Sequence, residues 1–300
     1  GQVEYPKSGQ QGFGTAPVFS QGSAFLPHVS LMVSPANTRT DPRTIRRMSD
    51  YCAPAEHSHP ALAQLAALHH LRVYVDIGVV VVVLVITNLI AHFTTTWASV
   101  ATVPAAAVVL VLLVRARGLG WSELGLGREH WRSGAGYALA AMGLVLMVVA
   151  VGALLPWTRP MFLNDRYATL SGAVVASMVI IPLQTVIPEE LAFRGVLHGA
   201  LDRAWGVRGV AAAGSLLFGL WHIASSMGLT SGNVGFTRVL GGGVAGMVAG
   251  IAMAVAATAA AGFVFTWLRR RSGSLIAPIA LHWSLNGMGA LAAALVWQLS

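Results

Sequence analysis

The stretch Leu170-Ser-Gly-Ala-Val-Val-Ala-Ser-Met-Val-Ile-Ile-Pro-Leu-Gln-Thr-Val-Ile-Pro-Glu-Glu-Leu-Ala-Phe-Arg194 decides the fold of this chain. The run before its two glutamates is apolar and long enough to enter a bilayer as a helix. An ionised carboxylate at bilayer depth costs several kcal/mol, so it needs a partner, a water-filled cavity or a function. Glu190 and Arg194 are four residues apart and face each other on a helix. Glu189 keeps no local partner, which predicts a general base.

The composition of the whole chain agrees with a membrane setting. Of its 300 residues, 55% are hydrophobic and 10% are charged, and the mean hydropathy is +0.67. Soluble domains carry about 25% charged residues. The apolar runs are continuous rather than alternating, which favours helices over a β-barrel. The sequence therefore predicts an all-α polytopic protein in the lipid bilayer.

Apolar runs divide the second part of the chain into about seven membrane-spanning helices. The fourth run exceeds one span, so we expect it to emerge from the bilayer, kinked by its two prolines. The expected helices are 73–91, 97–114, 134–155, 170–201, 209–226, 239–268 and 275–299.

Arginines alternate between the connections and predict the orientation. If their richer side is cytoplasmic, the chain has its N-terminus inside and is a multi-pass protein of the plasma or inner membrane. The net charge of +8 is spread over loop ends, which does not favour a nucleic-acid-binding surface. Residues expected on the cytoplasmic side are Arg72, Arg115, Arg117, Arg128, Arg132, Arg203, Arg208, Arg269, Arg270 and Arg271; Arg159, Arg166 and Arg238 are left on the other side.

Residues 1–60 differ from the rest in composition. They hold seven of the 13 prolines and many Gly, Ser and Gln residues, without apolar periodicity. We expect a disordered polar arm there. The remaining residues, 61–300, are predicted to form one transmembrane helical domain whose motif core is 170–300. The single Cys52 excludes an intramolecular disulfide.

A few polar side chains fall well inside the apolar runs. They are the two glutamates, His222 in the fifth helix, and His282 and Asn286 in the seventh. Counting 1.5 Å per residue along each helix brings them to one band around the midplane. We expect them to share a cavity that faces the cytoplasm, because isolated polar groups at this depth are costly.

The same residues resemble the motifs of a known family. Glu189-Glu-Leu-Ala-Phe-Arg194 is similar to its EExxxR motif, Phe218-Gly-Leu-Trp-His222 to FxxxH, and His282-Trp-Ser-Leu-Asn286 to HxxxN. All three occur in the family's order and each lies in an apolar helix. Residues 70–300 thus resemble the CPBP family, which comprises CAAX-prenyl endopeptidases and bacteriocin-processing or immunity (Abi) membrane proteases.

The resemblance implies a role for each motif residue. Glu189 would activate a water held with His222, and Glu190 would pair with Arg194 to brace the site. The histidine and asparagine of the third motif would donate hydrogen bonds to the oxyanion of the peptide carbonyl. The implied catalytic set is Glu189, Glu190, Arg194, His222, His282 and Asn286.

The sequence leaves a metal cofactor open. Two histidines and one glutamate suffice for a catalytic zinc, and here they would be Glu189, His222 and His282. The chain has no HExxH arrangement. Direct activation of water by glutamate and histidine is the interpretation we favour.

The expected activity is that of an intramembrane endopeptidase acting on peptides or membrane-protein segments. Two alternatives use the same residues differently. A proton- or metal-coupled transporter also needs intramembrane Glu and His, but along a path through both leaflets. A non-catalytic binding or immunity protein would keep the fold without turnover. The sequence leaves the substrate and the oligomeric state open.

Overall fold

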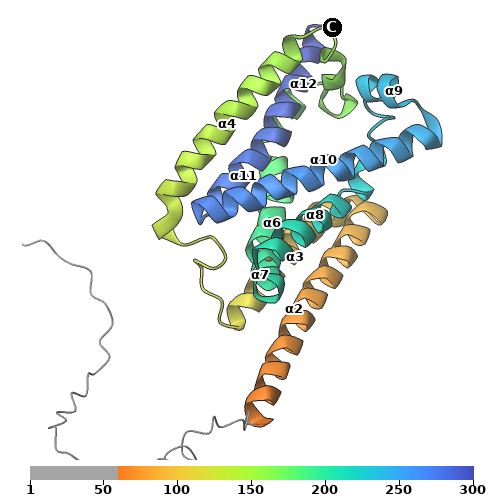
Figure 1. Ribbon diagram of the computed structural model, residues 1–300. Coiled ribbons are helices and arrows are strands. Elements are labelled where there is room, and N and C mark those ends of the chain that lie inside the picture. The colour runs from red at the N-terminus through yellow and green to blue at the C-terminus, as the bar shows by residue number, and fades with distance from the viewer. Residues whose placement is uncertain (1–59) are drawn as a thin grey trace, which may run out of the picture. The chain divides into compact units, whose positions relative to one another are not determined.

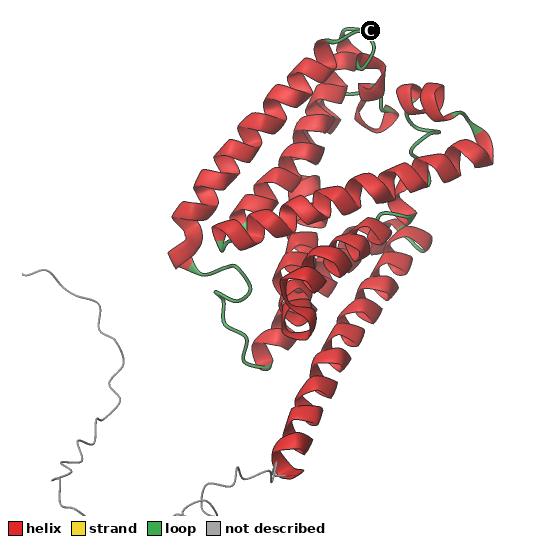
Figure 2. Ribbon diagram, in the orientation of Figure 1, coloured by secondary structure: helices red, strands yellow, loops and turns green. Residues whose placement is uncertain are grey.

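The structure is a computed structural model that describes residues 60–300, and within them it is built from helices and loops (Figures 1 and 2). The only β-type pairing among these residues is an isolated bridge between Asn164 and Asn233. The predicted polar arm, residues 1–60, falls outside the described residues except for its last position. The α-helices are α2 (Pro60–Phe93), α3 (Thr96–Ala116), α4 (Trp131–Leu154), α5 (Leu170–Val175), α6 (Ile187–Glu190), α7 (His198–Gly209), α8 (Ser215–Trp221), α9 (Val234–Leu240), α10 (Gly243–Ser272), α11 (Ile276–Trp283) and α12 (Gly289–Gln298).

Six helical segments of the described residues are long and apolar enough to cross a membrane, which confirms the polytopic all-α fold. The fourth, Leu170–Trp221, contains both the fourth and the fifth predicted helices. Its chain turns at Gly206, where φ is 61° and ψ is −160°. Glycine adopts this backbone conformation without the Cβ clash that other residues would meet. The six segments are His70–Phe93, Thr96–Ala116, Arg128–Leu154, Leu170–Trp221, Gly243–Ser272 and Ile276–Gln298.

The arginine-rich connections meet at one end of the bundle. Arg269 donates a hydrogen bond to the carbonyl of Glu123 at 2.8 Å. Arg270 pairs with Asp202 at 2.9 Å. These contacts join the last turn of α10 to the connection after α3 and to α7, as the charge pattern predicted for one membrane face.

The connections at the other end are joined as well. The Asn233 amide donates to the carbonyl of Met161 at 2.8 Å, and Arg159 donates to the carbonyl of Leu299 at 2.9 Å. The loop after α4, the segment before α9 and the end of α12 therefore lie together. Figure 1 shows the C-terminus beside the end of α4.

The fifth predicted helix is shorter than expected. It was predicted to reach Ser226, but α8 ends at Trp221. Carbonyls at a helix end need outside partners, and side chains supply them here: the Asn88 amide of α2 donates to the carbonyl of Trp221 at 2.9 Å, and Ser226 donates to that of His222 at 2.6 Å. Irregular backbone is tolerated inside a membrane where it lines a cavity, and the residues after α8 do so.

Aromatic rings fill the core between the motif helices. Phe218 and Phe265 are each 1% exposed, and the Phe218 ring packs edge-on against Phe193 with centroids 5.1 Å apart. The outer faces of α2, α3 and α4 instead expose large apolar side chains, as lipid-facing helices do. Examples are Val82, Leu112, Leu139 and Val148.

Close contact between α8 and α10 depends on Gly219. A Cβ at this position would lie 2.7 Å from the carbonyl oxygen of Val255 and 2.9 Å from the Ala259 side chain. Small residues let membrane helices approach closely. Gly219 thus brings the helix that carries the second motif against α10.

Candidate active site

The two adjacent glutamates end the short helix α6, between two stretches of π-helix, Ala176–Val186 and Leu191–Leu197. Pro182 lies in the first stretch and Pro188 in α6, and proline removes a backbone donor from the regular helix. Wider π turns are frequent at functional sites. Successive residues of a helix point about 100° apart, so the two carboxylates enter different surroundings.

The Glu189 carboxylate lies at the wall of a cavity. The residue is 6% exposed, and its Oε1 accepts a hydrogen bond from the indole nitrogen of Trp221 at 3.0 Å. Its Oε2 makes no hydrogen bond with any described residue. This oxygen lies 4.0 Å from Nε2 of His222. One oxygen of the carboxylate is therefore fixed, and the other is a buried acceptor without a partner among the described residues.

The local contacts of His222 define its tautomer. Its Nδ1 lies 2.7 Å from the carbonyl oxygen of Phe218, one turn earlier. A carbonyl only accepts, so Nδ1 carries the hydrogen and Nε2 of the neutral ring presents a lone pair. Water hydrogen bonds are about 2.8 Å long, so one water can donate to Nε2 and to Oε2 of Glu189 across their 4.0 Å separation.

Glu190 belongs to a buried network. The residue is 0% exposed, and its Oε1 accepts from Nη1 of Arg194 at 3.0 Å and from Nδ1 of His282 at 2.9 Å. The Arg194 guanidinium carbon lies 3.9 Å from the centroid of the Phe218 ring and 4.8 Å from that of Phe265. The pair of Glu190 with Arg194 is the one that the resemblance implied. The contact with His282 joins the first motif to the third and was not predicted from the sequence.

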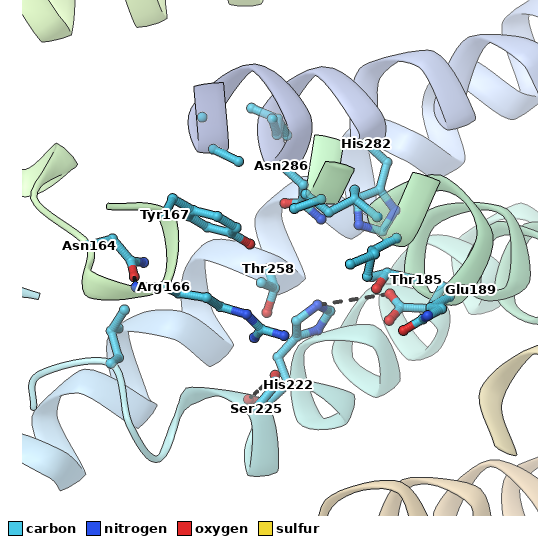
Figure 3. A pocket seen from close by; sticks show the side chains of 18 of the residues that line it. Asn164, Arg166, Tyr167, Thr185, Glu189, His222, Ser225, Thr258, His282 and Asn286 are labelled. Carbon is cyan, nitrogen blue, oxygen red and sulfur yellow. Dashed lines mark hydrogen bonds and ion pairs between the residues drawn. The ribbon is translucent and has the colours of Figure 1, made fainter. Parts of the chain in front are cut away.

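The third motif reaches the same cavity. His282 and Asn286 both line it, from α11 and from the π-helical turn Ser284–Met288 that follows (Figure 3). The His282 ring stacks on Phe265 at 5.1 Å, which fixes its orientation. The Asn286 side chain makes no hydrogen bond to the described residues, so its amide can bind a ligand.

The cavity has a volume of about 1130 Å³ and gathers Glu189, His222, His282 and Asn286. Glu190 and Arg194 lie behind this wall and are not part of its lining. The six predicted site residues thus divide into four that face the cavity and two that support it. Further polar lining residues are His92, Ser99, Asn164, Arg166, Tyr167, Gln184, Thr185, Ser225, Asn233 and Thr258.

A zinc ion does not fit the arrangement of the predicted ligands. Zinc requires its protein ligands at about 2.0–2.2 Å from one point. Within residues 60–300, no group of three or more His, Cys, Asp or Glu side chains is arranged to hold a metal ion. Nδ1 of His282 contacts Glu190, and Nδ1 of His222 contacts a backbone carbonyl, so each ring has only Nε2 left to bind a ligand.

The position of the cavity along the bundle differs from the expectation. Asn88, which binds the end of α8, lies about 24 Å along α2 from Arg72 and only about 8 Å from Phe93. The lining residues of the connecting loops come from the end opposite the arginine-rich connections. The sequence predicted that the arginine-rich end and the cavity both face the cytoplasm. In the structure the cavity lies toward the opposite end of the bundle, so only one of these two predictions can hold.

Two lining residues with strong polar groups were missed in the sequence. Trp221 was counted as part of an apolar helix, although an indole directly before a motif histidine can donate to a carboxylate. Arg166 was used only as a topology marker. Neither the hydrogen bond of Trp221 to Glu189 nor the position of Arg166 at the cavity has a signal in the sequence, because each brings together segments that are far apart along the chain.

A comparison with protein-family models agrees with the three motifs. Residues 171–288 match the model described as Rce1-like, Type II CAAX prenyl endopeptidase Rce1-like. The matched segment runs from α5 to the turn after α11, so it contains every predicted site residue. The match is consistent with the CPBP family and confirms the resemblance. No curated protein and no solved structure matches the chain.

Proposed function

From the premise that residues 171–288 are an Rce1-like segment of an integral membrane protein, we propose that the chain is an intramembrane endopeptidase. Its substrates would be peptides or membrane-associated protein segments. The observation that carries this proposal is the pair of free acceptors, Oε2 of Glu189 and Nε2 of His222, 4.0 Å apart at the cavity wall.

The proposed reaction begins with a water bound between these two acceptors. Glu189 takes a proton from the water while the water oxygen attacks the carbonyl carbon of the peptide bond. The tetrahedral intermediate then breaks its carbon–nitrogen bond, and the leaving nitrogen receives the proton from Glu189. His222 orients the water throughout, because its Nε2 accepts the second hydrogen.

Stabilisation of the oxyanion is assigned to the third motif. The Asn286 amide donates one hydrogen bond. His282 donates from Nε2 when its ring carries both hydrogens, with Nδ1 donating to the Glu190 carboxylate. Each preorganised donor contributes about 3–4 kcal/mol in such sites. Glu190 and Arg194 act through His282 and do not touch the substrate.

We propose that this chemistry requires no metal. The arrangement of acceptors supports direct water activation, since Oε2 of Glu189 and Nε2 of His222 lie 4.0 Å apart, a separation that one water can bridge. A purified enzyme is then expected to retain its activity in a strong chelator, whereas a zinc enzyme would lose it.

The experiment is cleavage of a quenched membrane-peptide library by detergent-purified protein. Glu189→Gln keeps the size and the hydrogen bond from Trp221 and is expected to abolish cleavage. Glu129→Gln is the matched control, because Glu129 is exposed and lies outside the cavity. Normal cleavage by Glu189→Gln, in a sample that is free of contaminating protease, would disprove the mechanism.

The alternatives predict other results. A binding or immunity protein would retain its cellular phenotype in Glu189→Gln. A transporter would show substrate-dependent ion flux in liposomes. A transporter also needs polar residues along a path through both leaflets. The cavity lining contains none of the residues of the arginine-rich end, so within the described bundle its polar residues do not reach that end.

A further inference from the structure

Arg166 enters the cavity from a loop that other segments hold in place. It lies in the short 3-10 turn Asp165–Tyr167, between α4 and α5. The carbonyl of Asn164 accepts from the indole of Trp297 at 3.0 Å, and the amide of Asp165 donates to the carbonyl of Gly232 at 3.3 Å. The Asn164 side chain also accepts from the Arg166 amide at 3.0 Å. The turn is thus fixed to α12 and to the segment before α9.

The side chain of Arg166 points toward the catalytic pair. Figure 3 shows its guanidinium beside His222, on the side away from Glu189. Among residues 60–300 no carboxylate pairs with it. Three arginines of the described bundle do pair with a carboxylate: Arg117 with Asp76, Arg194 with Glu190, and Arg270 with Asp202.

The cavity itself offers no counter-ion for this cation. Its one acidic lining residue is Glu189, which is 6% exposed and bound to Trp221. A guanidinium presents a planar fork of donors that matches a carboxylate. The cavity is therefore suited to an anionic group beside His222.

We propose that Arg166 binds a carboxylate of the substrate close to the bond that is cut, and so selects acidic peptides. This inference rests on the proposed peptidase function, because the anionic groups of an unmodified peptide are its C-terminal carboxylate and its Asp and Glu side chains. Arg166 would be a specificity-determining residue that contacts the substrate rather than the attacking water.

The test measures binding separately from cleavage, in full-length protein carrying Glu189→Gln to prevent turnover. The probes are fluorescent hexapeptides of leucine and alanine. One has a free C-terminal carboxylate and one a C-terminal amide; two further amides carry a single internal Glu or Gln. The first pair isolates the terminal carboxylate and the second isolates an acidic side chain.

We expect one acidic probe to bind about 2- to 5-fold more tightly than its neutral partner, as for an ion pair with an exposed arginine. Adding Arg166→Gln should remove this ratio while leaving the affinity of the neutral probe unchanged. Arg166→Lys should restore part of it, because the charge remains but the planar fork is lost. Arg238→Gln is the matched control: Arg238 is exposed near the same end of the bundle and does not line the cavity.

Each outcome separates this inference from the proposed function. Equal affinity for acidic and neutral probes, or a ratio that persists in Arg166→Gln, overturns the role of Arg166 even if the wild-type protein cleaves peptides. A ratio that depends on Arg166 supports the inference even if the wild-type protein cleaves none of the probes, in which case the peptidase proposal alone loses support.

Discussion

Substitution by glutamine is predicted to change the stability of the protein at one of the two adjacent glutamates, Glu190, but not at the other, Glu189. In Glu190→Gln, the glutamine keeps the volume but removes the only carboxylate that pairs with Arg194, which is 2% exposed. Breaking one partner of a buried ion pair costs about 3–5 kcal/mol, because the remaining charge stays desolvated. For a domain of this size that loss lowers Tm by roughly 6–20 °C.

Glu189→Gln should leave the stability nearly unchanged. The glutamine oxygen still accepts the hydrogen bond from Trp221, and the oxygen that is replaced by the amide nitrogen makes no hydrogen bond in the structure. We expect a change within about 1 kcal/mol, as for substitutions that remove no satisfied partner. Cleavage should nevertheless be lost, since the glutamine cannot take a proton from water.

The assay is thermal unfolding of both detergent-purified variants, followed by circular dichroism, with peptide cleavage measured on the same samples. Glu129→Gln serves again as the exposed control. If Glu190→Gln has the same Tm as the wild-type protein, the buried network contributes no net stability. If Glu189→Gln melts as low as Glu190→Gln, the division into a catalytic and a supporting glutamate is wrong.

Three further predictions concern the surroundings of the site. Trp221→Phe removes a hydrogen bond to a charged group and should lower kcat/KM about 10- to 100-fold with little change in Tm; unchanged kinetics would mean that the indole does not position Glu189. Gly219→Ala should destabilise the protein by about 1–3 kcal/mol, because its Cβ would overlap α10; a melting curve like that of the wild-type protein would contradict this contact. In right-side-out vesicles of a cysteine-free variant, a membrane-impermeant thiol reagent should label Ser225→Cys but not Arg117→Cys, because the predicted orientation puts the arginine-rich end inside; the reverse pattern would place the cavity on the cytoplasmic side.

The sequence predicted the class of the fold because the bilayer restricts it. Long apolar runs must form helices whose backbone groups are satisfied internally, and the helical segments of residues 60–300 follow these runs closely. The sequence also limited the site to a few side chains, since an acid such as Glu189 inside an apolar run is costly without a function. Glu190 and Arg194 were paired correctly because four-residue spacing on one helix is local information.

Other features were decided by contacts between distant segments. The sequence predicted a helix as far as Ser226, but α8 ends at Trp221, whose carbonyl accepts from the amide of Asn88 in another helix. The hydrogen bond from Trp221 to Glu189 and the one from His282 to Glu190 both cross between helices. Helical periodicity fixes which residues share a face, but it does not fix which helices are neighbours or how each is rotated.

The location of the cavity has the same origin. The sequence placed Glu189, His222 and the third motif at comparable depth in the apolar runs, although α8 ends just before His222. Only the tertiary structure decided that the loop carrying Arg166 folds over them and that the lining continues away from the arginine-rich end. Depth along one helix follows from its own residues, whereas the shape and the opening of a cavity depend on the packing of all the helices around it.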